Sequence, residues 1–247
     1  MDWSRAKNVL IYAFLLLNLV LGYQLWNDLR EQADESPDLT SLAGNVQRAM
    51  DNKNIKVAAA IPTETPELPK ISYRFVDANG EKPMMLDKTV YSKLIFSPEE
   101  LVSGLADSIP DIGNYRYDPV EDGEGKFVMH PLVEGKYPLF RVNLVLYYSE
   151  QRIVSYTEQR IEISSIGEEE GQRVLSASKA LGNLVENYLP NDSVVKSIEL
   201  GYYGELFNSD AQVAAPAWRF ALESGEVFYV QGISGDVISA GSDKTKE

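Results

Sequence analysis

The stretch WRFALESGEVFYVQGISGDVI (Trp218–Ile238) decides the fold of the C-terminal part of the chain. It contains runs of aromatic and β-branched residues that are separated by two turn-forming sequences, Ser224-Gly225 and Ser234-Gly235-Asp236. This pattern predicts antiparallel strands at Ala217–Glu223, Val227–Gln231 and Val237–Ala240. A further strand is predicted just upstream, at Val194–Leu206.

A helix is predicted before these strands, beginning at Glu168–Glu170 and ending near Pro190. Acidic residues suit its first turn because the N-terminal end of a helix carries partial positive charge. The apolar residues of the segment recur at helical spacing and form one stripe: Val174, Ala177, Leu181, Leu184, Val185 and Tyr188. This half of the chain is therefore predicted as a helix followed by an antiparallel sheet.

The same order of elements is predicted upstream. Ser97-Pro98-Glu99-Glu100 combines an N-cap residue, a proline at the first helical position and acids in the first turn, so a short helix should run to about Ser108. Before it, the turn sequence Asp77–Gly80 lies between Ile71–Val76 and Lys82–Leu86 and predicts a β-hairpin. After it come strand-like runs at Asn114–Pro119, Lys126–His130, Leu139–Tyr148 and Arg152–Ile163.

Two similar halves are the resulting prediction, at residues 71–165 and 166–247. A shared pattern supports a duplication, since Pro138–Leu144 and Pro216–Leu222 both read P-x-aromatic-R-apolar-x-L. The predicted fold class is α+β, with an N-terminal transmembrane helix and an extracellular domain built of two helix and antiparallel-sheet halves.

Residues 27–70 are predicted to be a juxtamembrane stalk and linker. Leu39, Leu42, Val46 and Met50 recur at helical spacing and indicate a short helix. The segment Ile61–Lys70 has three prolines in ten residues, which favours an extended connector.

The apolar run VLIYAFLLLNLVLGYQLW (Val9–Trp26) contains no charged residue. As a helix its 18 residues would be about 27 Å long, against a bilayer core of roughly 30 Å, so we predict a transmembrane helix over residues 8–26. Arg5 and Lys7 precede the run and acids follow it, which places residues 1–7 in the cytoplasm and the C-terminal domain outside. A cleaved signal peptide is the alternative, but no A-x-A-like site directly follows the run.

One face of this helix is a candidate for contact with a partner helix. An amide in hydrocarbon is costly unless it is hydrogen-bonded, and Gly22, four residues after Asn18, allows a second backbone to approach closely. The predicted face consists of Ile11, Phe14, Leu15, Asn18, Gly22 and Leu25. In the alternative interpretation, Asn18 only bonds to its own helix backbone.

Charge and cysteine content exclude several classes of function. The net charge of −14 argues against nucleic-acid binding, because an acidic surface repels phosphate backbones. The chain has no cysteine, so it contains no disulfide, thiol nucleophile, Cys-ligated zinc or lipoprotein attachment site.

Enzymatic motifs are absent from the sequence: there is no G-x-S-x-G, P-loop, dinucleotide fingerprint or H-E-x-x-H. His130 is the only histidine, and we interpret it as an edge or packing residue rather than a general base. Acidic residues gather in the Gly-rich turn Asp118–Glu124, where solvated charge is the default and a weak calcium site the alternative. The prediction is a non-enzymatic protein without a metal or cofactor.

With these features together, the chain resembles the YycI (WalI) family of regulatory proteins. The most specific residues are Met1–Lys7, which lead directly into the apolar run, and Asn54-Ile55-Lys56-Val57. Trp218–Ile238 also resembles the last strands of PepSY-type modules. The family resemblance implies a single-pass membrane protein of Gram-positive bacteria. It would act with a YycH-like sister protein on the WalK sensor histidine kinase, whose response regulator WalR controls cell-wall metabolism.

Two other functions are considered beside this one. The first is an extracellular PepSY-like module that restrains a protease or binds a ligand. The second is a wall-associated hydrolase, which would need a pair of acids such as Asp118 and Glu121.

Overall fold

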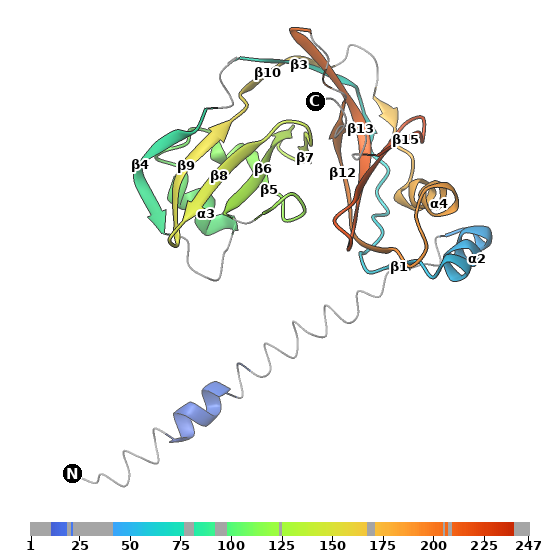
Figure 1. The fold of residues 1–247 in the computed structure, drawn as a ribbon, viewed down its shortest axis with the longest axis horizontal. Helices are drawn as coiled ribbons and strands as arrows, with labels where there is room; N and C mark the ends of the chain where they lie inside the picture. The colour runs from blue at the N-terminus through green and yellow to red at the C-terminus, as the bar shows by residue number, and fades with distance from the viewer. Residues whose placement is uncertain are drawn as a thin grey trace.

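The computed structural model describes residues 11–18, 21, 42–76, 82–91, 98–123, 125–166, 171–204, 206 and 209–239. These residues form two large, mainly antiparallel sheets with three helices packed on them, and a separate two-stranded sheet (Figure 1). The predicted α+β class is thus confirmed, and sheet is the larger component.

The larger sheet has the strand order β1 (Lys56–Val57), β12 (Val194–Tyr203), β13 (Ala211–Leu222), β14 (Val227–Gln231) and β15 (Val237–Ser239). Strand β3 (Ile71–Phe75) pairs with β13 and also with β10 (Ile161–Ile166). All of these pairs are antiparallel except β1 with β12. The predicted strands between residues 194 and 240 are therefore present, with shifted ends.

Helices α2 (Gly44–Lys53) and α4 (Ala177–Asn187) lie on the side of this sheet that faces away from the smaller one (Figure 1). Ser176 caps α4 by accepting a hydrogen bond from the Lys179 N–H, and the apolar stripe of α4 is buried. The core between helices and sheet includes Val46, Met50, Leu181, Leu184, Trp218 and Phe220.

The smaller sheet has the order β4 (Met84–Tyr91), β9 (Arg152–Glu158), β8 (Leu144–Ser149), β6 (Lys126–Val133) and β5 (Tyr115–Tyr117), with β7 (Tyr137–Pro138) paired to β6. Helix α3 (Pro98–Leu105) and the 3₁₀ turn η2 (Ile112–Asn114) cover one face. That core includes Leu101, Leu105, Met129, Leu144, Leu146 and Ile153. A separate two-stranded ladder joins β2 (Glu67–Leu68) and β11 (Gln172–Arg173).

The expected hairpin of Ile71–Val76 with Lys82–Leu86 is wrong. Strand β3 pairs with β10 and β13, whereas β4 pairs with β9. Ile71 and Tyr73 are both fully buried. A strand with such buried side chains is more stable inside a sheet, between two partner strands, than in an isolated hairpin. As a result β3 and β10 connect the two sheets, across the top of Figure 1.

Part of the predicted 27–70 stalk lies in the core. Val46, Met50, Ile55, Val57 and Leu68 are all buried with residues of the larger sheet. The helical spacing of Val46 and Met50 correctly indicated a helix, α2, but the apolar face of that helix packs on the protein's own sheet and α4. The boundaries of the two predicted halves stay a prediction.

Two finer predictions also differ from the structure. Helix α4 begins at Ala177, since residues 172–173 form β11, and Glu168–Glu170 lie outside the described residues. The two copies of the P-x-aromatic-R pattern have different structures: Pro216–Leu222 lies within one strand, β13, whereas residues 138–144 run from the end of β7 through a turn and loop to the start of β8. This pattern therefore does not mark a structural repeat.

Residues 11–18 are helical. In the described ranges, no helix combines the length and the apolar character needed to cross a membrane. Most of the predicted 8–26 helix lies outside those ranges, so the anchor stays a prediction.

Candidate functional site

A network of buried charged side chains joins the two sheets, and Asp118 lies at its centre. Asp118 follows β5, and its side chain is 2% exposed. Its Oδ1 accepts a hydrogen bond from the Val120 N–H at 2.9 Å, which fixes the turn after β5. The predicted solvated turn is therefore wrong for Asp118, because other buried groups compensate its charge.

Arg219 is the main partner of Asp118 and comes from the other sheet, on β13. Its Nη2 donates to Asp118 Oδ1 at 3.0 Å and its Nη1 donates to Asp118 Oδ2, so the two side chains form a bidentate ion pair. Its Nη2 also donates to Glu199 Oε2 at 2.8 Å. Glu199, on β12, accepts a further bond from Arg116 Nη1 of β5 at 2.8 Å, so charged groups link the sheets twice.

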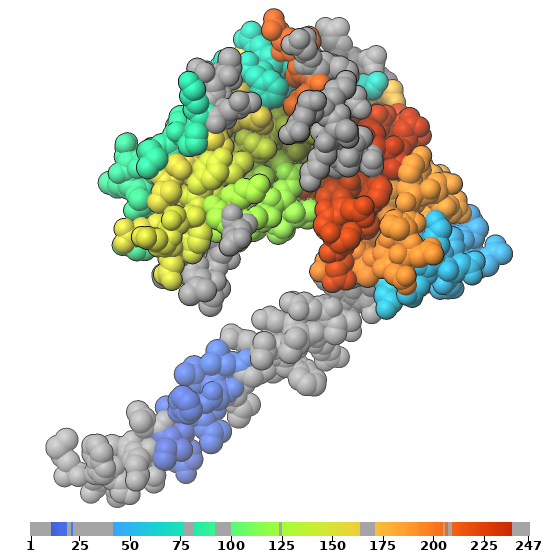
Figure 2. Space-filling model, viewed as in Figure 1, coloured from blue at the N-terminus to red at the C-terminus, as the bar shows by residue number. Residues whose placement is uncertain are grey.

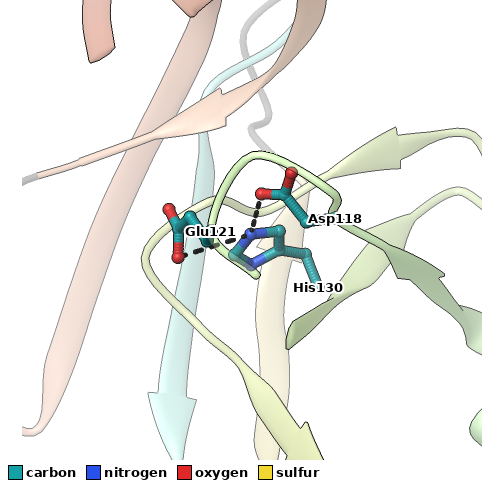
Figure 3. A group of neighbouring side chains, drawn as sticks. All are labelled: Asp118, Glu121 and His130. Carbon is teal, nitrogen blue, oxygen red and sulfur yellow. Dashed lines mark hydrogen bonds and ion pairs between the residues drawn. The ribbon is translucent and has the colours of Figure 1, made fainter. Parts of the chain in front are cut away.

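His130 completes the network from β6, with 1% of its side chain exposed. Its Nδ1 lies 2.8 Å from the carbonyl oxygen of Val142, and its Nε2 lies 2.9 Å from Asp118 Oδ2. Glu121 Oε2 lies 3.9 Å from the same Nε2, and Figure 3 shows both carboxyl groups beside the ring. His130 is thus a buried polar partner on an inner strand, not an edge residue.

Aromatic rings surround the charges. The Arg219 guanidinium lies over the Phe140 ring at 4.4 Å, and the rings of Tyr203 and Tyr229 stack at 4.1 Å. The Phe140 N–H donates to the Tyr202 carbonyl at 3.0 Å, which ties the turn after β7 to β12. This close approach needs Gly201, because a Cβ there would lie 2.5 Å from the Pro138 oxygen. We call the region formed by Asp118, His130, Phe140, Glu199 and Arg219 the joint.

The electrostatics of the joint favour ionised Asp118. Burial alone would raise its pKa, but the hydrogen bonds from His130 and Arg219 outweigh burial and hold the pKa well below its usual range. Burial likewise opposes the charge of Arg219, yet Asp118 keeps the Arg219 pKa above its usual value. For Glu121, burial is the largest influence, and it raises the pKa of this carboxyl group.

The side chains of Asp118, Glu121 and His130 could in principle bind a metal ion, because their ligand atoms lie within 4.8 Å of one another. Asp118, however, already accepts bonds from Arg219, His130 and the Val120 N–H. The guanidinium therefore occupies the position at which a metal cation would neutralise this carboxylate. The arrangement is suited to holding the sheets together.

A hydrolase would need both acids to reach a substrate. Asp118 is buried and has donors on both oxygens, so it cannot act on a bound sugar without breaking the joint. The geometry argues against Asp118 and Glu121 as a catalytic pair.

Two pockets border the joint at Arg116. One, of about 240 Å³, lies between the sheets and includes Lys136, Glu199 and Trp218 in its wall. The other, of about 510 Å³, is mainly apolar and lies between α3 and β5, with Val102, Ile109 and Met129 in its wall. Figure 2 shows the surface hollowed between the green and yellow half and the red strands.

The sequence picked out Asp118, Glu121 and His130 separately but did not predict that they meet Arg219. One signal was available, because Arg219 is the sole charge in the apolar run AAPAWRFAL (Ala214–Leu222). A buried arginine requires an acid nearby. Of the predicted transmembrane face, Ile11, Phe14, Leu15 and Asn18 are described, whereas Gly22 and Leu25 lie outside the described residues.

The fold and the joint define a sheet-rich α+β protein in which buried charges hold two sheets together. A family model described as YycI protein matches residues 86–233, and the chain belongs to the YycI family. This confirms the predicted resemblance. The family is regulatory and non-catalytic, and the matched region contains the whole joint.

Solved structures show more distant likenesses. An uncharacterized protein from Eubacterium rectale ATCC 33656 is 16% identical, with a TM-score of 0.34, over 64% of this chain and 49% of that chain. The chain thus spans about half the length of that protein. The Bacillus megaterium YpeB C-terminal domain is 10% identical, with a TM-score of 0.39, over 80% of this chain and 97% of that chain. No curated protein matches the chain.

Proposed function

We propose that this chain is a membrane-anchored, non-enzymatic regulator of a WalK-like sensor histidine kinase, acting with a YycH-like sister protein. The YycI family match over residues 86–233 carries the proposal. The apolar run Val9–Trp26 supports an anchor, and the acidic charge of the chain suits contacts with proteins better than with nucleic acid. In this proposal the cell membrane holds the span, and the folded domain lies outside.

The orientation of the chain gives the first test. Since Arg5 and Lys7 precede the span, the N-terminus should stay in the cytoplasm and the domain should be outside. Protease added to wall-stripped cells should therefore remove an epitope placed at the C-terminus but spare one at the N-terminus. A C-terminal epitope that survives until the cells are lysed would contradict the orientation.

The proposed contact with partner helices is centred on Asn18. Its Nδ2 donates to the Phe14 carbonyl at 2.9 Å, which is the bond expected in the alternative interpretation. An amide has a second N–H and a carbonyl oxygen, so this bond leaves groups for a partner helix. Gly22 would lie on the same face and admit a neighbouring backbone.

Replacing this amide gives the second test. Asn18→Leu should reduce co-purification of the kinase or the sister protein several-fold, because an interhelical hydrogen bond is worth roughly 0.6–2 kcal/mol in a bilayer. Expression of wall-remodelling genes should change in parallel.

The control combines Asn18→Leu with Leu16→Asn, which moves the amide about 160° around the helix and should not restore the complex. Normal association of Asn18→Leu at normal protein abundance would reduce the span to a plain anchor. The regulatory contacts would then lie in the domain.

A further inference from the structure

The outer edge of strand β12 is open between two places where the chain's own segments pair with it. At its start β12 pairs with β1, and the Ala58 N–H donates to the Val195 carbonyl at 2.9 Å. Near its end, Leu139 forms a parallel bridge with Tyr202. Among the described residues, no segment pairs with this edge over residues 196–201. This leaves roughly 20 Å of edge, at about 3.3 Å per residue, without a partner strand.

The backbone groups of Ile198 and Leu200 point to this open edge. Tyr202 lies opposite Pro216 of β13, which has no N–H and whose carbonyl accepts a bond from the Gly232 N–H at 2.7 Å. The polar groups of Pro216 therefore face β14, and Tyr202 directs its own N–H and carbonyl outward. The register is continuous over this part of β12. Because the groups of an antiparallel ladder alternate, Leu200 and Ile198 also direct their N–H and carbonyl outward.

A cavity of about 240 Å³ lies at this open edge, and we call it the slot. Ile198, Glu199 and Leu200 line its β12 side. Opposite them lie residues of the connector after β1 and of the smaller sheet: Pro62, Glu64, Arg116, Lys136 and Tyr137. The proline-rich connector passes the edge without pairing with it, since a proline cannot donate to a ladder.

The groups in the slot are those that bind an extended peptide. Two N–H groups and two carbonyl oxygens, two residues apart on one strand, match the groups along one edge of another strand. A segment of about three to five residues can bond to all four. The side chains of Ile198 and Leu200 pack against the core, so the added segment should carry apolar side chains at alternate positions. A small apolar molecule would leave the backbone groups without partners.

We propose that the slot binds an extended segment of a partner protein, which adds a short strand to β12. Glu199 lies between the two open residues, and its carboxylate accepts bonds from Arg116 and Arg219. The added strand would therefore hold β12 where the joint crosses to the smaller sheet. The slot follows from the pairing of β12, whereas the identity of the partner as the sister protein rests on the proposed function.

Amide hydrogen exchange tests whether the edge is open. The full chain is studied in lipid nanodiscs, with exchange resolved residue by residue. The Ile198 and Leu200 amides should exchange at least about 100-fold faster than the Glu199 amide, which faces β13. Equally slow exchange of all three amides would show that the edge is already covered and would overturn the proposal.

A test strand then supplies the ligand. The synthetic peptide Thr-Val-Thr-Val-Thr is ligated to the C-terminus through a flexible linker of about 25 Gly and Ser residues, which gives an effective concentration in the millimolar range. It should slow exchange of the Ile198 and Leu200 amides about ten-fold and leave that of Glu199 unchanged. A peptide that gives no such protection would refute the slot as a strand site.

Methylated test strands separate backbone pairing from apolar contact. One version carries methyl groups on the valine amides and the other on the threonine amides. One version should lose the protection and the other should keep it, because only alternate N–H groups of a strand face β12. Equal loss with both versions would mean that the side chains alone bind, which contradicts strand addition.

The natural ligand is tested in the complex of the chain with the sister protein, purified in nanodiscs. The Ile198 and Leu200 amides should exchange at least about ten-fold more slowly in the complex than in the free chain. A complex that leaves both amides at their free rates would overturn the proposal but keep the proposed function. If no complex forms, the proposed function fails, and the attached test strand decides whether the slot binds a strand.

Discussion

Asp118→Asn should lower the free energy of unfolding by about 3–5 kcal/mol at pH 7, because it leaves the buried Arg219 charge without its carboxylate. Because the amide has the same size as the carboxylate, the substitution creates no cavity. The loss of stability therefore comes from the removed charge and the changed hydrogen bonds. Urea unfolding of the chain in nanodiscs, followed by tryptophan fluorescence, measures it.

The same variant should show a defined dependence on pH. Hydrogen bonds from His130 and Arg219 hold the folded-state pKa of Asp118 well below its usual range, although burial opposes this. Such a carboxylate stabilises the fold above its unfolded pKa of about 3.9, and that stabilisation is lost as the pH falls toward the lower folded value. The difference between the natural chain and Asp118→Asn should therefore narrow below about pH 4.

A matched control uses the exposed pair of Arg74 and Glu162, whose side chains are 61% and 58% exposed. Glu162→Gln removes a carboxylate from an arginine as Asp118→Asn does, but in water. Its expected cost is less than about 1 kcal/mol. Equal effects of the two variants would show that burial does not decide the strength of the joint.

Local patterns predicted the elements of this fold well, because they are set by neighbouring residues. The alternation in Trp218–Ile238 and its glycine turns predicted β13 to β15, and Ser97-Pro98 predicted the start of α3. Local patterns did not predict the pairing of β3, whose partners β10 and β13 lie about 90 and 140 residues away in sequence. The turn-forming residues after Val76 favoured pairing of β3 with the next strand in the sequence, but in the structure β3 pairs with these two distant strands instead.

The joint was harder to predict for the same reason. Asp118 and Arg219 are separated by 101 positions, and nothing in the Gly-rich turn indicates that its first acid is buried. The arginine in an apolar strand shows that a buried acid must exist, but several acids of the chain could have filled that role. The sequence thus indicates that Arg219 forms a buried ion pair, and only the fold identifies Asp118 as its partner.

Gly201→Ala should lower the free energy of unfolding by about 3 kcal/mol, at the upper end of the usual cost of overpacking. A Cβ at this position would lie 2.5 Å from the Pro138 oxygen and 2.6 Å from Phe140 Cε2. The first of these is a backbone atom of β7, so relief requires the turn after β7 to move away from β12. The Phe140 N–H would then lose its bond to the Tyr202 carbonyl, and the Phe140 ring would leave the Arg219 guanidinium.

Gly113→Ala is the control for Gly201→Ala, because a Cβ at Gly113 meets no atom within 4 Å, and it should change stability by less than about 0.5 kcal/mol. Thermal unfolding in nanodiscs compares the two variants. The distance between spin labels at Ser149→Cys on β8 and Lys196→Cys on β12, both exposed positions, shows whether the sheets separate. If the joint transmits a signal to the kinase, Gly201→Ala should change expression of wall-remodelling genes at normal protein abundance, whereas Gly113→Ala should not. A loosened joint with unchanged gene expression would restrict the joint to a structural role and leave regulation to the span.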